Sequence, residues 1–168
     1  MKSFTFAVKA ALLAAAAVAT GNAFAASASA DATATVVTPI AITSTADLVF
    51  GKFSAGTGGS VVMSNAGARS KTGSVVLLTG TAGGAAGFNV TGDANATYSI
   101  SLPADDSVTV SDGASHSMAV DSFISNPGSS GTLTGGAQAV AVGATLTVGS
   151  GQAAGAYTGT FAVGVEYN

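Results

Sequence analysis

From Ala30 onward, apolar positions recur at every second residue, not at the 3.6-residue period of a helix. Val, Thr, Ile, Phe and Tyr dominate the later runs, and these residues suit a half-buried pleated surface. This pattern predicts a chain made of short strands. Besides a candidate at 30–37, the predicted strands span residues 48–53, 60–64, 74–79, 88–91, 98–102, 108–111, 118–125, 138–148 and 157–167.

Glycine-rich turns separate these runs. Examples are residues 56–59, 83–84, 112–113, 126–128 and 149–151, where glycine supplies positive φ angles at little cost. About ten short strands with no helical pattern indicate an all-β fold, specifically an antiparallel, immunoglobulin-like β-sandwich. No linker or repeat interrupts residues 38–168, which we expect to form one β-sandwich domain.

The first 25 residues have the three-part layout of a secretory signal peptide. Lys2 and Lys9 precede an apolar run at 10–19, and 23–25 reads Ala-Phe-Ala, a small-x-small cleavage site. Cleavage is expected after Ala25, with Ala28 and Ala30 as alternatives. The apolar run is too short to span a bilayer. A short N-terminal helix of the mature fold is the other interpretation.

The two ends of the mature chain are the most informative part of the sequence. In the last predicted strand, alternate residues from Tyr157 to Tyr167 share one face, and its free edge is open for pairing. Residues 26–37 also alternate and end before Pro39, which cannot donate a ladder hydrogen bond. Residues 30–37 are either an ordinary first strand, or residues 26–37 form an extension that adds a strand to the next copy.

A resemblance bears on this choice. Residues 33–37, 40–44 and 46–51 resemble the opening of spore coat protein U-like and archaic chaperone–usher pilin domains, and 154–167 resembles their closing strand. Pilins characteristically carry a glycine fourteen residues from the C-terminus and a penultimate tyrosine, which Gly155 and Tyr167 match. Residues 65–70 and 73–78 look like a related secreted bacterial family of unknown function. Many such domains carry a disulfide, whereas this chain has no Cys.

The resemblance implies an incomplete sandwich that is completed by a donor strand, first from a periplasmic chaperone and then from a neighbouring subunit. The implied donor residues are Ala30, Ala32, Ala34 and Val36. The implied acceptor wall is Tyr157, Phe161, Val163 and Val165. The implied chaperone-recognition residues are Gly155, Tyr167 and Asn168, whose terminal carboxylate suits a basic partner.

Composition narrows the function classes. Only 8% of residues are charged, with five Lys+Arg against eight Asp+Glu, so no basic patch suits nucleic acid. One His and no Cys argue against a transition-metal site, and no nucleophile elbow or phosphate loop occurs. A calcium site at Asp105, Asp106, Asp112 and Asp121 lacks the usual loop spacing. We expect no enzyme activity and no cofactor.

Two functions remain open. The first is an exported structural subunit of a pilus-like surface fibre, assembled from copies of itself or related subunits by donor-strand complementation. A periplasmic chaperone and an outer-membrane usher would assist it. Its mature chain would not insert into a membrane, and it would pass through the periplasm to the cell surface. The alternative is a monomeric secreted sandwich that binds polysaccharide or a surface protein.

Overall fold

The computed structural model describes residues 25–80 and 82–168. By its internal contacts the chain divides into two units, residues 1–35 and 36–168. In the described part of the first unit, residues 25–35 form neither helix nor strand and all their side chains are exposed. The predicted signal peptide lies outside the described residues except for Ala25.

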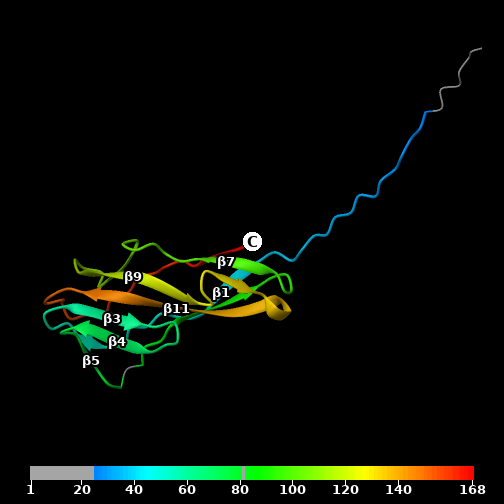
Figure 1. Ribbon diagram of the computed structural model, residues 1–168. Helices are drawn as coiled ribbons and strands as arrows, with labels where there is room; N and C mark the ends of the chain where they lie inside the picture. The colour runs from blue at the N-terminus through cyan, green and yellow to red at the C-terminus, as the bar shows by residue number, and fades with distance from the viewer. Residues whose placement is uncertain (1–24, 81) are drawn as a thin grey trace, which may run out of the picture. The chain divides into compact units, whose positions relative to one another are not determined.

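The second unit is all-β and antiparallel, as predicted (Figure 1). Its strands are β1 (Ala41–Ala46), β2 (Phe53–Ser54), β3 (Gly59–Met63), β4 (Arg69–Gly73), β5 (Val76–Leu77), β6 (Ala86–Thr91), β7 (Thr97–Ser101), β8 (Val108–Ser111), β9 (Ser117–Asn126), β10 (Ser130–Thr132), β11 (Ala137–Val148) and β12 (Gly164–Tyr167). A single 3-10 turn at Thr134–Gly136 precedes β11. No helix in the described ranges is long and apolar enough to cross a membrane.

The larger sheet is organised around β11. The first half of this twelve-residue strand pairs with β6, its second half pairs with β3, and β9 pairs along its middle. Strands β1, β4 and β8 complete the sheet at its margins. A register shift between Gly143 and Thr145 faces Ser122, whose φ of 52° marks a bulge in β9.

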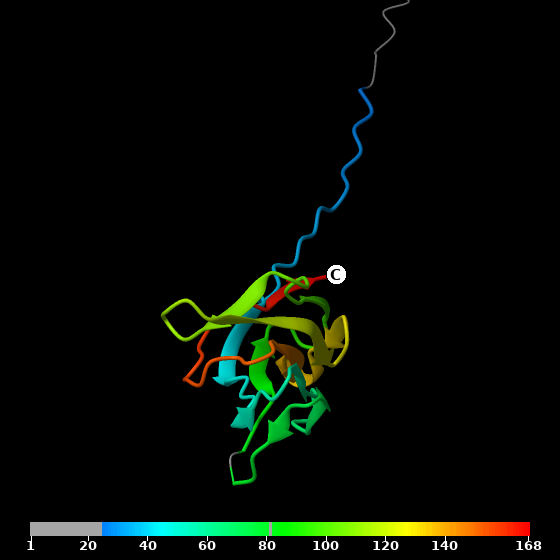
Figure 2. The same ribbon diagram turned by 90° about the vertical axis from the view of Figure 1, so that its left-hand side faces the viewer.

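A second layer covers one half of this sheet. Strands β10, β7 and β12 form a three-stranded sheet, and the fully buried Tyr98 of β7 packs with Val90, Val140, Val142 and Leu133. Burial raises the pKa of Tyr98, and its hydroxyl donates to Gln138 Oε1 at 2.8 Å. This half is therefore a closed sandwich core (Figure 2).

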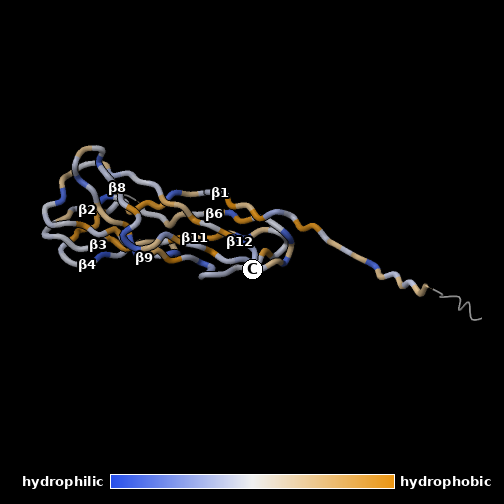
Figure 3. The backbone as a smooth tube through the Cα atoms, turned by 90° about the horizontal axis from the view of Figure 1, so that it is seen from above, coloured by the Kyte–Doolittle hydropathy of each residue, from blue (hydrophilic) through white to orange (hydrophobic). Residues whose placement is uncertain are grey.

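The other half of the sheet carries a second core cluster. Val61, Val108, Val120 and Leu146 are its buried members, among others. Opposite them lie the two-residue strands β2 and β5 and a segment at 152–161 that forms no strand. The second layer is thus far less regular here, although apolar residues still line the interior (Figure 3).

The structure confirms most predicted strands to within two residues. These are the ones that became β3, β6, β7, β8, β9 and β11. Strands β1, β4 and β10 were not among the predicted strands. Strand β4 is polar and carries Arg69 and Lys71, as is common for an edge strand. It lacks the apolar alternation from which the other strands were predicted.

Three predicted strands are wrong over much of their length. The one at 74–79 is reduced to β5. The predicted strand at 48–53 is reduced to β2, because Gly51 has a φ of 70° and turns the chain out of the extended region. The predicted strand at 157–167 is reduced to β12 and one isolated bridge, Ser111 to Thr158. Its partner β7 ends at Ser101, shortly before Pro103, so residues 159–163 extend beyond it.

Residues 30–37 are not the first strand of their own sandwich. The first strand is β1, and residues 25–40 carry no strand assignment. Of the two interpretations of this segment, the ordinary first strand is the one that the structure contradicts.

Candidate functional site

An open groove of about 1240 Å³ lies where the second layer is irregular. One wall is the chain at 44–55, and the other is the C-terminal segment, residues 152–161. Its floor is made by buried apolar side chains of the larger sheet. They are Ala86, Val108, Met118, Val120 and Leu146.

The groove walls carry large apolar side chains that are only half-buried. Phe50 and Phe53 stand on one wall, and Tyr157 and Phe161 on the other. The Phe161 ring packs at 5.1 Å from Phe123 and edge-on at 6.2 Å from Phe88, measured between ring centroids. Aromatic rings that are half exposed along a hollow indicate a surface suited to an apolar occupant.

The backbone along one wall has an unused edge. Residues 159–163 join no ladder in the described part of the chain, although β12 pairs with β7 directly after them. Thr158 is held to Ser111 by two backbone hydrogen bonds of 2.8 and 2.9 Å. The segment is therefore anchored at both ends, passes close to the Thr109 carbonyl oxygen of β8 at Gly159, and has no ladder hydrogen bonds between its anchors among the described residues.

The opposite wall is fixed by Arg69. Its guanidinium donates to the carbonyl oxygens of Phe50 at 3.1 Å, Lys52 at 3.3 Å and Leu78 at 2.8 Å. The Lys52 oxygen also accepts from the Leu78 N–H at 3.1 Å, so Arg69 joins the chain at 50–52 to the chain at Leu78. Charge on the described lining residues comes from Asp47 and Lys52, both exposed and both on this wall.

The predicted acceptor residues fall into two groups. Tyr157 and Phe161 line the groove, as the resemblance implies. Val163 and Val165 do not line it; they are half-buried against the closed core around Tyr98. The predicted alternation is present, because these four residues and Tyr167 are half-buried while the residues between them are exposed.

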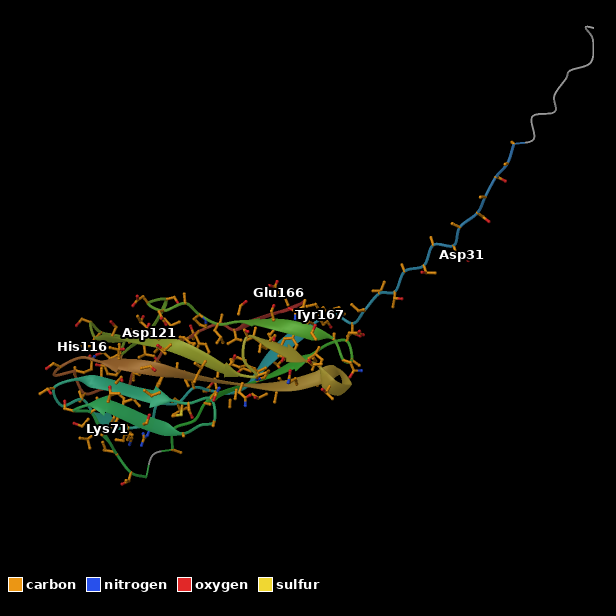
Figure 4. The ribbon with its side chains drawn as sticks, in the orientation of Figure 1. Asp31, Lys71, His116, Asp121, Glu166 and Tyr167 are labelled. Atoms are coloured by element: carbon orange, nitrogen blue, oxygen red, sulfur yellow. The ribbon has the colours of Figure 1, made fainter. Side chains whose placement is uncertain are left out.

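The predicted recognition residues are also separated. Gly155 lies in the groove wall, where an added Cβ would meet Asp112 Cβ at 3.7 Å and Tyr157 Cε2 at 3.8 Å, which are ordinary contacts. Tyr167 lies at the other end of the domain, away from His116 and Lys71 (Figure 4). Its hydroxyl donates to the Thr38 oxygen and accepts from the Asp93 N–H, both at 2.6 Å.

Asn168 and the predicted donor residues make few contacts. The Asn168 N–H donates to the Thr97 oxygen at 3.3 Å. The donor residues Ala30, Ala32, Ala34 and Val36 are all exposed, and Val36 keeps 96% of its surface accessible. An apolar side chain left so open is one that a partner can bury.

Sequence reasoning missed most of the groove. Leu48, Phe50 and Phe53 were assigned to a predicted strand but not to the acceptor wall. The floor residues come from β6, β8, β9 and β11, which are distant in sequence. The one local signal was Gly51, because a glycine inside an apolar alternating run marks a break in the strand.

The acidic residues considered for calcium act as local structural contacts. Asp105 accepts from the Ser122 N–H at 2.7 Å, and Asp121 accepts from the Asp106 N–H at 2.8 Å. Asp112 pairs with His116 Nδ1 at 2.6 Å, and this hydrogen bond holds the pKa of Asp112 below its ordinary value. Among the described residues, no three His, Cys, Asp or Glu side chains gather as a metal site.

The comparisons with known proteins concern the whole sandwich. The family described as domain of unknown function DUF4402 matches residues 40–167. The chain belongs to the DUF4402 family. The matched range begins just before β1 and ends with β12, so the DUF4402 domain contains the groove and excludes residues 26–37. No curated protein and no solved structure gave a significant match.

Proposed function

We propose that this DUF4402 protein is an exported structural subunit of a surface fibre that assembles by donor-strand complementation. In this proposal the extension, residues 26–37, of one copy lies in the groove of the next copy. The observation that carries the proposal is the apolar groove beside residues 159–161, which belong to a segment, 159–163, without ladder partners among the described residues. Strand addition to such an edge uses main-chain hydrogen bonds for affinity and alternate side chains for fit.

The extension has the composition that this groove requires. Its inward positions would be Ala30, Ala32, Ala34 and Val36, which are small and apolar, while Asp31, Thr33 and Thr35 would face solvent. The wall aromatics already fill part of the space, so small inward residues avoid steric conflict with Phe53 and Phe161. Burying Val36 would contribute about 1.5–3 kcal/mol, and each alanine methyl about 0.8 kcal/mol or less.

The placement of the two features supports an open chain of subunits. Thr38, which follows the extension, is hydrogen-bonded to Tyr167 at one end of the domain. The groove is lined instead by residues of β8, the β2 region and Tyr157. Strands β8 and β2 lie toward the end of the domain away from β12 (Figure 3). A contact that joins two different surfaces of identical copies generates a filament unless the rotation closes a ring.

The partners and route follow from the same proposal. An apolar groove exposed during export would need a temporary strand, which a periplasmic chaperone would supply before an outer-membrane usher exchanges it for the extension. The expected destination is the cell surface. No observation specifically favours the alternative of a monomeric polysaccharide-binding module.

Deletion of the extension tests the proposal directly. We expect a chain without residues 26–37 to remain monomeric, whereas the intact mature chain forms polymers detectable by electron microscopy and gel filtration. The matched control replaces residues 26–37 by twelve Gly and Ser residues, which keeps the length but removes the alternating apolar positions. Unchanged polymers in either variant would contradict the proposal.

A self-complemented variant tests the groove without requiring assembly. Residues 26–37 are appended after Asn168 through a short turn, so the added strand can run back along residues 159–163. We expect the midpoint of thermal unfolding to rise by roughly 5–10 °C, because a few kcal/mol of burial and ladder bonds are gained. The control appends the Gly and Ser segment. Equal melting temperatures would show that the groove does not accept this strand.

A further inference from the structure

The extension carries one charged residue. Between residues 25 and 46 the only ionisable side chain is the carboxylate of Asp31. The groove that would receive this segment has two charged lining residues in the described structure, Asp47 and Lys52, on the same wall. These are five residues apart in sequence, on either side of the isolated bridge at Val49. One lining charge therefore attracts Asp31 and the other repels it.

The facing of the side chains is compatible with the attractive pairing. On the wall, Leu48, Phe50 and Phe53 are half-buried toward the core, whereas Asp47 and Lys52 are exposed. In the extension, alternation places Asp31 on the outward face when Ala30 and Ala32 point inward. Asp31 beside Lys52 thus keeps both charges at the surface, with Ala30 and Ala32 next to wall residues that face the core.

We infer that Asp31 of an incoming copy lies beside Lys52 of the receiving copy, and that this ion pair sets the register of the inserted strand. The inference rests on the proposed function and specifies how the same groove selects its occupant. A shift by one residue would turn Asp31 into the apolar groove, and a larger shift toward Asp47 would oppose two carboxylates.

The surroundings of Lys52 strengthen the attraction. The three basic residues of the described chain are Lys52, Arg69 and Lys71. Arg69 donates to the Lys52 carbonyl, and β4 carries both Arg69 and Lys71. The positive charge of the domain is therefore concentrated near one part of the groove wall, and it would steer an acidic strand to that part.

Disulfide trapping tests the position. The chain has no cysteine, so a chain carrying both Asp31→Cys and Lys52→Cys contains one engineered pair. A bond requires Cα atoms within about 7 Å. We expect mild oxidation of assembled protein to give a ladder of covalent multimers on a non-reducing gel. The matched control, Asp31→Cys with Asp47→Cys, should give little ladder.

The outcomes separate this inference from the proposed function. A ladder in the control that equals or exceeds the ladder of the 31–52 pair would overturn the register while leaving strand exchange intact. A bond formed within a single chain would also overturn the inference, because each copy would then occupy its own groove. If the unmodified chain forms no polymer, the proposed function itself fails.

Charge reversal tests the ion pair separately from the position. We expect Asp31→Lys and Lys52→Asp each to slow assembly about tenfold at low ionic strength, and the double variant to recover most of the rate. The wild-type rate should fall as salt rises. Lys71→Asp reverses a nearby charge without removing the pair, and it should slow assembly less than Lys52→Asp does, because Lys71 does not line the groove. A double variant as slow as the single ones would refute the pairing.

Discussion

At the scale of single residues, Gly155 and Gly159 of the C-terminal segment differ in whether the fold leaves room for a side chain. A Cβ at Gly159 would approach the Thr109 carbonyl oxygen of β8 too closely for any real side chain. A Cβ at Gly155 would make only ordinary contacts. The fold therefore requires glycine at 159, whereas nothing in the contacts of the domain requires it at 155.

This difference predicts opposite effects of the same substitution. Gly159→Ala should lower the free energy of unfolding by about 1–3 kcal/mol, because β8 and the segment must move apart. Gly155→Ala should change it by less than about 0.5 kcal/mol. Urea denaturation of both variants measures this. If Gly155→Ala impairs assembly without changing the free energy of unfolding, glycine at this position is required for contact with a partner. Equal destabilisation by both variants would show that the fold requires glycine at both positions.

A second residue-scale prediction concerns Tyr167. Its hydroxyl joins Asp93 and Thr38, so it ties β12 to the chain just before β1 across 129 residues of sequence. Tyr167→Phe should cost about 1–3 kcal/mol of unfolding free energy, because the partly buried Asp93 N–H loses its acceptor.

The matched control is Tyr157→Phe. The Tyr157 hydroxyl bonds only to its own loop in the described chain, donating to the Ala153 oxygen and accepting from Gln152, both at 2.9 Å. We expect a smaller loss there, since these groups lie within five residues of Tyr157 and the bonds join no segments distant in sequence. Equal losses in the two variants, measured by chemical denaturation, would show that the Tyr167 bridge has no special structural role.

At the scale of elements, the sequence identified strands better than it identified their partners. Alternation located β6, β8, β9 and β11, because each places large apolar residues on one buried face. Alternation also predicted residues 157–167 as one strand, and the side-chain facing is correct. Only residues 164–167 pair in a ladder, because their partner β7 ends at Ser101, shortly before Pro103. The sequence of the segment itself does not indicate where its partner strand ends.

The groove could not be predicted from the sequence, because it too depends on how distant segments pack together. Its floor combines residues from four strands. No local sequence pattern indicates that the second layer above these residues is irregular. The half-buried aromatics Phe50, Phe53 and Phe161 look in sequence like ordinary core positions. What the sequence could indicate was that both termini alternate, which is the condition for one end to pair with the other.

The unpaired edge predicts a specific pattern of hydrogen exchange. In the monomer, amides at 159–163 should exchange faster than those of the flanking β12, because they lack ladder partners. On assembly, or in the self-complemented variant, the same amides should become at least tenfold more protected. Mass spectrometry of peptides from this region measures both rates. Protection of 159–163 in the monomer equal to that of β12 would contradict an open edge.

At the scale of the whole molecule, the sandwich has two core clusters and a second layer that fully covers one of them. Leu48, Phe123 and Phe161 contact both clusters and hold the two halves together. The uncovered half places half-exposed aromatics next to an open backbone edge, an arrangement that isolated sandwiches avoid. A chain with 8% charged residues has few charged side chains with which to shield it.

Val36 gives the sharpest test of whether another copy covers this half. Because 96% of Val36 is exposed, Val36→Asp should leave the unfolding free energy of the domain within about 0.5 kcal/mol of the wild type. In an assembled fibre the same carboxylate would enter the groove without a partner, so polymerisation should fail. The matched control is Thr35→Asp, which adds the same charge on the outward face and should still assemble. Gel filtration and electron microscopy distinguish the two variants. Equal assembly of both would mean that Val36 does not enter the groove, and equal failure would mean that added charge, not facing, is what blocks assembly.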